Sequence, residues 1–292
     1  MRFSRIGRFC AAMSLCALPL VWSSAQQPDL PPGELVRQAV NNEMSANAAS
    51  NRHFMFKDEK RTPHLSQTKL IVETRDATAG MMFLQNGEPL SPQQQQAERL
   101  RLENYVRNPD ELNRKRKQER EDAERTQRIV KALPEAFLYQ TDGTQEGTAN
   151  LGRAGDRLVR LKFRPNPSYD PPSRVEQVLT GMAGTLLVDS TEKRIAEIDG
   201  TLQKDVSFGW GILGHLDRGG RFVVQQADVG GKHWELTRME LAFTGKVLFF
   251  KRLDIRSSDI FSEFRPVPKD LSFAQAVDLL NAEAAKMTRT AP

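Results

Sequence analysis

The second half of the chain alternates apolar and polar residues, which is the pattern of β-strands with one buried face. In residues 157–163, for example, Val159, Leu161 and Phe163 fall on one side and two basic residues fall on the other. Comparable runs predict further strands at 53–60, 66–74, 80–85, 185–189, 194–206, 221–229, 233–246 and 247–256.

The connections between several of these runs are short and contain glycine. Asn86-Gly87 is a tight-turn signal, and Gly230-Gly231 separates two of the predicted strands. Strands joined by short turns are antiparallel, because parallel neighbours need a long crossover connection. One polar face and one apolar face fit a sheet that is covered on one side. We therefore expect an α+β fold with an antiparallel sheet and helices over its apolar face.

Three segments outside the strands have helical spacing. Residues 34–49 place apolar side chains on one helical stripe, residues 173–180 can form one or two turns, and residues 273–285 close the chain as a short helix.

The segment 91–133 is largely polar. Ser91-Pro92 and Asn108-Pro109 each have the form of a cap followed by proline in the first turn. They predict two helices, at 92–107 and 109–132, with Pro134 ending the second. Within this helical pair lies a basic cluster that is a candidate for binding a protein partner, although a solvated face with i,i+4 ion pairs is the favoured interpretation. The cluster consists of Arg114, Lys115, Arg116 and Lys117.

The first residues have the three parts of a secretory signal peptide. Arg2, Arg5 and Arg8 give a positive start, an apolar run covers residues 9–22, and Ser23-Ser24-Ala25 offers small residues for cleavage. A membrane anchor is the alternative, but a spanning helix needs about 20 apolar residues and this run is shorter. We expect cleavage after Ala25, a periplasmic location, and one domain over residues 26–292 that contains the helical pair at 91–133 as an insertion.

Cysteine content and charge narrow the class of protein further. Cys10 and Cys16 are the only cysteines, and both lie in the predicted signal peptide, so the exported chain has no disulfides and depends on its core. The formal net charge of +5 includes three arginines of that peptide, so the remainder is nearly balanced. A balanced charge argues against nucleic-acid binding.

Motifs for catalysis, metals and cofactors are weak. His53, His64, His215 and His233 have no close metal-ligand spacing. Ser190 to Lys193 matches S-x-x-K, but it lies between two predicted strands and lacks its companion motifs, which favours a solvated turn. We therefore expect a protein that is not an enzyme and that uses no metal and no cofactor.

The stretch S-F-G-W-G-I-L-G-H-L at 207–216 contains G-x-G-x-x-G, the spacing of a dinucleotide-binding turn. That motif needs a helix directly after it, and here a strand follows, so nucleotide binding is not expected. The apolar residues between the glycines favour either a buried turn at the end of the sheet or a flap at the rim of an apolar cavity. These residues are Phe208, Trp210, Ile212 and Leu213.

Residues 179–260 carry a series of sheet motifs. They are T-G-M-A-G-T-L-L-V-D, R-I-A-E-I-D-G, V-S-F-G-W-G-I-L-G, F-V-V-Q-Q-A-D-V, W-E-L-T-R-M and L-F-F-K-R. With them the chain resembles exported bacterial proteins related to the periplasmic outer-membrane lipoprotein-sorting carriers. The resemblance implies a strongly curved antiparallel sheet, or half-barrel, with helices on its concave side and acyl chains held between the two.

The leading functional hypothesis is a non-enzymatic periplasmic binding protein for a lipid, a lipidated protein or another amphiphile. Hydrophobic burial would hold the ligand, with Phe208, Trp210, Ile212 and Leu213 at the rim. The alternative is an envelope interaction or sensor module with a filled core, which binds a protein through the charged helical pair. Inside the ligand site we expect Met239, Leu241 and Phe243.

Overall fold

The computed structural model describes residues 30–49, 52–208, 214–247 and 251–290. The contacts divide the chain into two units, Met1–Leu30 and Pro31–Pro292, and every described residue except Leu30 belongs to the second. The predicted signal peptide and the predicted rim residues Trp210, Ile212 and Leu213 lie outside the described residues. None of the described helices has the length and apolar character needed to cross a membrane.

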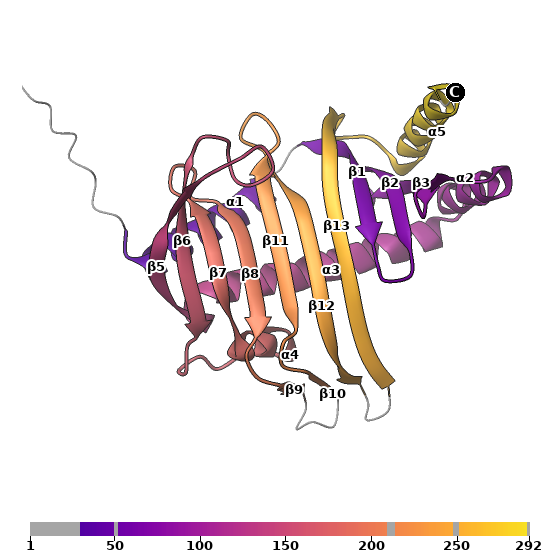
Figure 1. Ribbon diagram of the computed structural model, residues 1–292. Helices are drawn as coiled ribbons and strands as arrows, with labels where there is room; N and C mark the ends of the chain where they lie inside the picture. Colours follow the sequence, from indigo (N-terminus) through magenta and orange to yellow (C-terminus); the bar gives the residue numbers. More distant parts are fainter. Residues whose placement is uncertain (1–29, 50–51, 209–213, 248–250, 291–292) are drawn as a thin grey trace, which may run out of the picture. The chain divides into compact units, whose positions relative to one another are not determined.

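The described strands form a single sheet. They are β1 (His53–Arg61), β2 (Ser66–Val72), β3 (Ala79–Gln85), β4 (Glu88–Pro89), β5 (Phe137–Glu146), β6 (Arg157–Pro165), β7 (Met182–Asp189), β8 (Ile195–Leu202), β9 (Val206–Phe208), β10 (Gly214–Leu216), β11 (Arg221–Asp228), β12 (Trp234–Val247) and β13 (Lys251–Val267). Their order is β4-β3-β2-β1-β13-β12-β11-β8-β7-β6-β5, with β9 and β10 attached through β12 (Figure 1). Neighbouring strands pair in the antiparallel sense, and β4 and β5 at the two ends do not join, so the sheet is not closed. The predicted α+β class with an antiparallel sheet is confirmed.

The described residues also form five α-helices and one short 3₁₀ helix. They are α1 (Pro32–Ala49), α2 (Pro92–Arg107), α3 (Pro109–Ala136), α4 (Arg174–Gln177), α5 (Phe273–Thr290) and η1 (Val178–Gly181). The predicted helical pair is present with its predicted caps. Ser91 and Gln94 form a capping box at α2, and the Asn108 side chain accepts from the Glu111 backbone N–H at the start of α3.

Some predicted boundaries are wrong. Pro134 does not end the second helix of the pair, because proline removes only one backbone donor and α3 continues to Ala136. The predicted strand 194–206 stops at Leu202, where pairing with β11 ends, and β9 begins separately at Val206. β13 extends well beyond the predicted residue 256, because it pairs with both β12 and β1.

Cross-strand pairing aligns apolar residues from β6 to β12 on one face of the sheet. Leu161 pairs with Leu186 and Leu186 with Ile198, while Val224 pairs with both Ile198 and Met239. Directly paired residues point to the same face. Along this line the side chains are buried on β6, β7 and β8 and only half-buried on β11 and β12.

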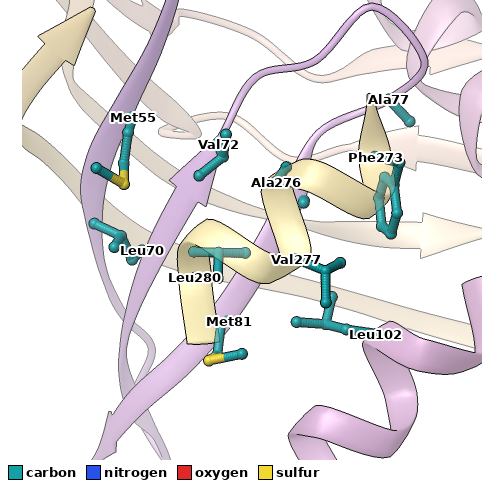
Figure 2. Packing of buried hydrophobic residues seen from close by; sticks show 11 residues of the cluster. Met55, Leu70, Val72, Ala77, Met81, Leu102, Phe273, Ala276, Val277 and Leu280 are labelled. Carbon is teal, nitrogen blue, oxygen red and sulfur yellow. The ribbon is translucent and has the colours of Figure 1, made fainter. Parts of the chain in front are cut away.

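At the end of the sheet formed by β1, β2 and β3, helix α5 covers the apolar side chains. One stripe of α5 packs on β1, β2 and β3, and Leu102 of α2 completes the cluster (Figure 2). The stripe has helical spacing and is formed by Phe273, Ala276, Val277 and Leu280, all of which are at most 4% exposed.

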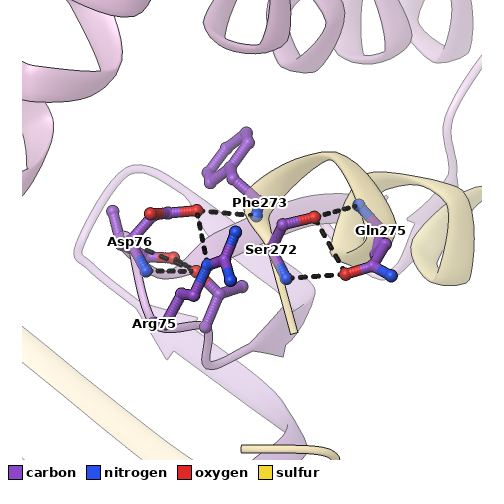
Figure 3. A network of polar contacts seen from close by, with 7 residues as sticks. Arg75, Asp76, Ser272, Phe273 and Gln275 are labelled. Carbon is purple, nitrogen blue, oxygen red and sulfur yellow. Dashed lines mark hydrogen bonds and ion pairs between the residues drawn. The ribbon is translucent and has the colours of Figure 1, made fainter. Parts of the chain in front are cut away.

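A polar network fixes the start of α5 against the turn between β2 and β3 (Figure 3). The Phe273 backbone N–H donates to Asp76 at 3.2 Å, and Arg75 lies 3.9 Å from the same carboxylate. Ser272 and Gln275 exchange hydrogen bonds between the side chain of each and the backbone N–H of the other. The turn and the helix are thereby held together.

Candidate functional site

A cavity of about 620 Å³ lies where the end of β2 and the start of β12 meet α1 and α3. Its walls are mainly charged, and we call it the polar cavity. Residues from distant parts of the sequence meet here, including two of the four histidines. The lining residues are Ala46, Arg52, His53, Glu73, Thr74, Asp76, Ala77, Thr78, Arg116, Glu119, Arg120, Arg194, Lys232, His233, Trp234 and Glu235.

Two glutamates on the strand side of the polar cavity are short of partners. Glu73, just after β2, accepts one hydrogen bond, from the Phe54 backbone N–H at 2.8 Å. Glu235, at the start of β12, has no hydrogen-bond or ion-pair partner among the described residues. Burial raises the pKa of both carboxyls; for Glu235 the nearby Glu73 adds to this effect, and its pKa rises from 4.5 to about 7. A cation bound between the two carboxylates would therefore stabilise their ionised forms.

Ring nitrogens in the same walls are also unsatisfied. Trp234 is 7% exposed, and its Nε1 has no hydrogen-bond partner among the described residues. The same holds for His53 Nδ1. His233 packs edge-on against Phe54, with the ring centroids 6.1 Å apart. Buried polar atoms normally have a partner, so these two ring nitrogens are exceptions. Both atoms are themselves buried, and the Trp234 ring is covered by Arg194, whose Cζ lies 5.5 Å from the ring centroid.

The basic residues of the polar cavity fall into two groups. Arg194 is already neutralised, because it donates two hydrogen bonds of 2.8 Å to the buried Glu43 of α1, and Lys232 pairs with Glu192 at 3.0 Å. Arg116 and Arg120 of α3 form no ion pair with a described residue. They lie one helical turn apart, and both are exposed. Arg52, just before β1, lines the polar cavity as well, so the strand side carries charges of both signs. The α3 side carries two arginines without an acidic partner among the described residues.

The polar side chains that anchor α3 here are satisfied. Glu119 accepts from Thr78 at both the backbone N–H, at 3.1 Å, and the hydroxyl, at 2.6 Å, and it pairs with Lys115 at 2.6 Å. These contacts fix the N-terminal half of α3 to the turn between β2 and β3. They leave Glu119 without capacity for a ligand, in contrast to Glu235.

Met239, Leu241 and Phe243, the residues predicted to lie inside the ligand site, project from one face of β12. The alternation places them together with Phe222 and Val224 of β11, and we call these five residues the apolar row. All five are half-buried. Phe222 lies over Gly200 and Phe243 over Gly220, since a Cβ at these glycines would come within 2.6 Å and 2.5 Å of the two rings.

None of the described helices makes its main contacts with the strands of the apolar row. Over the described residues the main contacts of α3 are with α1, α2, α4 and β5 rather than with β11, β12 or β13. The middle of α3 is the reason, because residues 116–126 are almost all charged or polar and nearly all exposed. A helix without an apolar stripe has nothing to bury against a sheet.

The remaining predicted residues are placed as follows. Phe208 lies in β9, half-buried, next to the residues outside the described chain. In the basic cluster, Arg114 pairs with Glu111, Lys115 with Glu119 and Lys117 with Glu121 along α3. Arg116 alone has no acidic partner among the described residues, and it lines the polar cavity. The local pairs match the solvated helical face that the sequence favours.

The S-x-x-K match has an ordinary structural role, and only the strands on either side of the glycine motif are described. Ser190 to Lys193 form the turn between β7 and β8, where Asp189 accepts from the backbone N–H groups of Thr191 and Glu192, both at 2.8 Å. The glycine motif after Phe208 is flanked by β9 and β10, which pair with each other in the antiparallel sense. Among the described residues no group of three His, Cys, Asp or Glu side chains is arranged to hold a metal ion.

Comparison of the chain with known protein families, with curated proteins and with solved structures finds no match. Functional inference therefore depends on the side chains of the polar cavity and the apolar row. Met239, Leu241 and Phe243 were predicted from the sequence as ligand residues, and that role stays a prediction, whereas the polar cavity was not predicted.

Proposed function

We propose that the protein is a periplasmic, non-enzymatic binding protein for an amphiphile, either a lipid or a lipidated protein. The observation that carries the proposal is the apolar row, five half-buried side chains on two adjacent strands with which no described helix makes its main contacts. An apolar surface of this kind in a soluble chain marks a binding site, because exposing it to water is unfavourable.

The position of the apolar row relative to the polar cavity supports an amphiphile rather than a purely apolar ligand. Trp234 and Glu235 line the polar cavity at the start of β12, and the apolar row begins at Met239 on the same strand. At ~3.3 Å per residue the two are separated by about 13 Å. A bulge at Thr237 lies between them, so that Glu235 pairs with Ala227 and Met239 with Val224, on opposite faces of the strand pair. A ligand with a charged end and an apolar chain would contact both by passing around the start of β12.

We further infer that the sheet curves as a half-barrel with α1 and α3 on its concave side, as the resemblance to lipoprotein-sorting carriers implies. Two observations support this arrangement. α1 packs against β7 and β8, and the two halves of α3 are fixed at opposite ends of the sheet order, near β3 and near β5. A helix of this length spans about 42 Å, enough to bridge the strands between.

Hydrophobic burial supplies the affinity in this proposal. Each Å² of apolar surface removed from water contributes about 25 cal/mol, so an acyl chain laid along the apolar row gains several kcal/mol before the entropy of association is subtracted. Replacing one of its central side chains by a charged one removes part of that gain and adds a desolvation penalty.

The test is uptake of a fluorescent fatty acyl probe by delipidated protein. We expect saturable uptake, and we expect Leu241→Asp to weaken it at least about tenfold, which corresponds to 1.4 kcal/mol. The matched control is Ala242→Asp, the next residue on β12, which is exposed on the opposite face and should leave uptake unchanged.

Absence of saturable uptake by the wild-type protein would overturn the proposal. So would equal uptake by Leu241→Asp and Ala242→Asp, provided that both variants keep a cooperative thermal transition. That second result would place the probe elsewhere on the molecule.

A further inference from the structure

The polar cavity contains more unsatisfied groups than structural roles explain. Its strand side has two half-buried glutamates with spare acceptor oxygens and the unpartnered Trp234 Nε1–H. Its helix side has two arginines without an acidic partner among the described residues. One ligand that carries both charges can therefore contact acidic groups on one side of the polar cavity and basic groups on the other.

We propose that the polar cavity binds a zwitterionic group, an ammonium a few bonds from an anionic phosphate, with the ammonium at Glu73 and Glu235. The inference rests on the proposed function, because it assigns the charged end of the same amphiphile to the polar cavity and the acyl chain to the apolar row.

The ammonium position follows from the arrangement of the two carboxylates. Both line one cavity; Glu235 accepts no hydrogen bond from a described residue and Glu73 accepts one, while Arg194 and His53 are the groups that partly offset their charges. Two carboxylates that share a low-dielectric site repel each other, and a cation placed between them removes the repulsion. The raised pKa values of both groups are a further sign that their negative charge lacks compensation.

The anion position follows from the opposite wall. Arg116 and Arg120 project from adjacent turns of α3, and guanidinium groups bind phosphate through paired hydrogen bonds. A volume of about 620 Å³ leaves room for such a group.

Ligands of one charge fit less well. A simple anion would satisfy the arginines and leave the glutamate pair uncompensated, and a metal ion lacks a third ligand within the described residues. A group with both charges complements the glutamates on one wall and the arginines on the other.

The first experiment compares headgroups on identical short acyl chains by isothermal titration calorimetry with the mature chain, residues 26–292. Wild-type protein should bind the phosphoethanolamine lipid at least about tenfold more tightly than the phosphoglycerol lipid, which has the phosphate but no ammonium. Free O-phosphoethanolamine is titrated in a parallel arm, and this arm distinguishes a lipid headgroup from a soluble zwitterion.

The variant Glu235→Gln keeps the shape of the side chain and removes its charge. It should reduce the preference for the phosphoethanolamine lipid about tenfold and leave binding of the phosphoglycerol lipid unchanged. The matched control is Glu240→Gln, on the same strand but outside the polar cavity, which should behave as wild type.

A second readout uses the unpartnered indole. In Trp210→Phe the mature chain keeps Trp234 as its single tryptophan, so a shift of its emission on adding the phosphoethanolamine lipid reports directly on the polar cavity. We expect this shift in the double variant Trp210→Phe/Glu240→Gln, and we expect its loss in the double variant Trp210→Phe/Glu235→Gln.

The outcomes separate this inference from the proposed function. Equal affinity for the two lipids, unchanged by Glu235→Gln, would overturn the zwitterion site even if the acyl probe is taken up. Binding of free phosphoethanolamine that depends on Glu235, without uptake of the acyl probe, would support the zwitterion site and overturn the amphiphile-binding function.

Discussion

Apolar side chains are buried to different extents at one end of the sheet and in its middle. At β2 and β3, near one end, the apolar residues are buried under α5. At β11 and β12, in the middle, the apolar row stays half-buried, and no described helix makes its main contacts with these strands. The strands of both regions have the same kind of alternating sequence. The difference therefore comes from the helices opposite them.

α5 and α3 are opposites in composition. α5 has an apolar stripe from Phe273 to Leu280 at helical spacing, so it can bury one side against the sheet. α3 is longer, but its apolar residues are concentrated toward its two ends, and its middle is charged. The comparison teaches that the helix opposite a strand, rather than the strand itself, decides whether an apolar face is fully buried or stays half-buried.

The largest expected effect is on stability at the α5 end. Leu280 is fully buried, so Leu280→Ala should lower the free energy of unfolding by about 2–5 kcal/mol, the usual loss for such a cavity. Leu241→Ala should lower it by about 1 kcal/mol or less, because a half-buried side chain loses less apolar contact. Urea denaturation followed by circular dichroism measures both. Equal losses would mean that the apolar row is as tightly packed as the α5 cluster.

The second effect concerns the polar cavity and depends on pH. The pKa of Glu235 is about 7 in the folded protein and near 4.5 when unfolded, so between these values the folded state holds the extra proton. Stability contributed by this group therefore falls as pH rises from about 4.5 to 7 and stays low above that. We expect Glu235→Gln to be more stable than wild type by about 2 kcal/mol at pH 8 and by much less at pH 5.

Unfolding free energies of the two proteins at pH 5 and pH 8 test this expectation. Burial and the charge of Glu73 raise the pKa of Glu235, and the charge of Arg194 lowers it. The first two effects outweigh the third, so the pKa is raised. A difference between variant and wild type that does not grow with pH would show that Glu235 is ionised normally and that its site is well solvated.

Local pattern was enough to predict most of the elements. The caps Ser91 and Asn108 located α2 and α3, and period-two alternation located most of the strands. The helix end predicted at Pro134 was wrong, because a single proline near the end of a helix removes one backbone hydrogen bond and does not force the helix to stop.

The polar cavity could not be predicted in the same way. Its key residues come from β1, from the end of β2 and from the start of β12, and they meet because β1 pairs with β13 beside β12. That strand order depends on long-range pairing, which alternation does not encode. The available signal was weak: a His-Trp-Glu run at 233–235 at a strand start, next to a turn marked by two glycines.

The smallest expected effect is on the middle of α3, and it bears most directly on the comparison. Lys117 lies 3.9 Å from Glu121, with the two side chains 72% and 47% exposed, and such surface pairs contribute little. Lys117→Ala should therefore change the free energy of unfolding by less than about 0.5 kcal/mol. It should also leave acyl-probe uptake unchanged, because the exposed Lys117 belongs to neither the apolar row nor the polar cavity. A larger loss of stability would mean that the middle of α3 packs on the sheet after all, and the apolar row would then be a core rather than a binding surface.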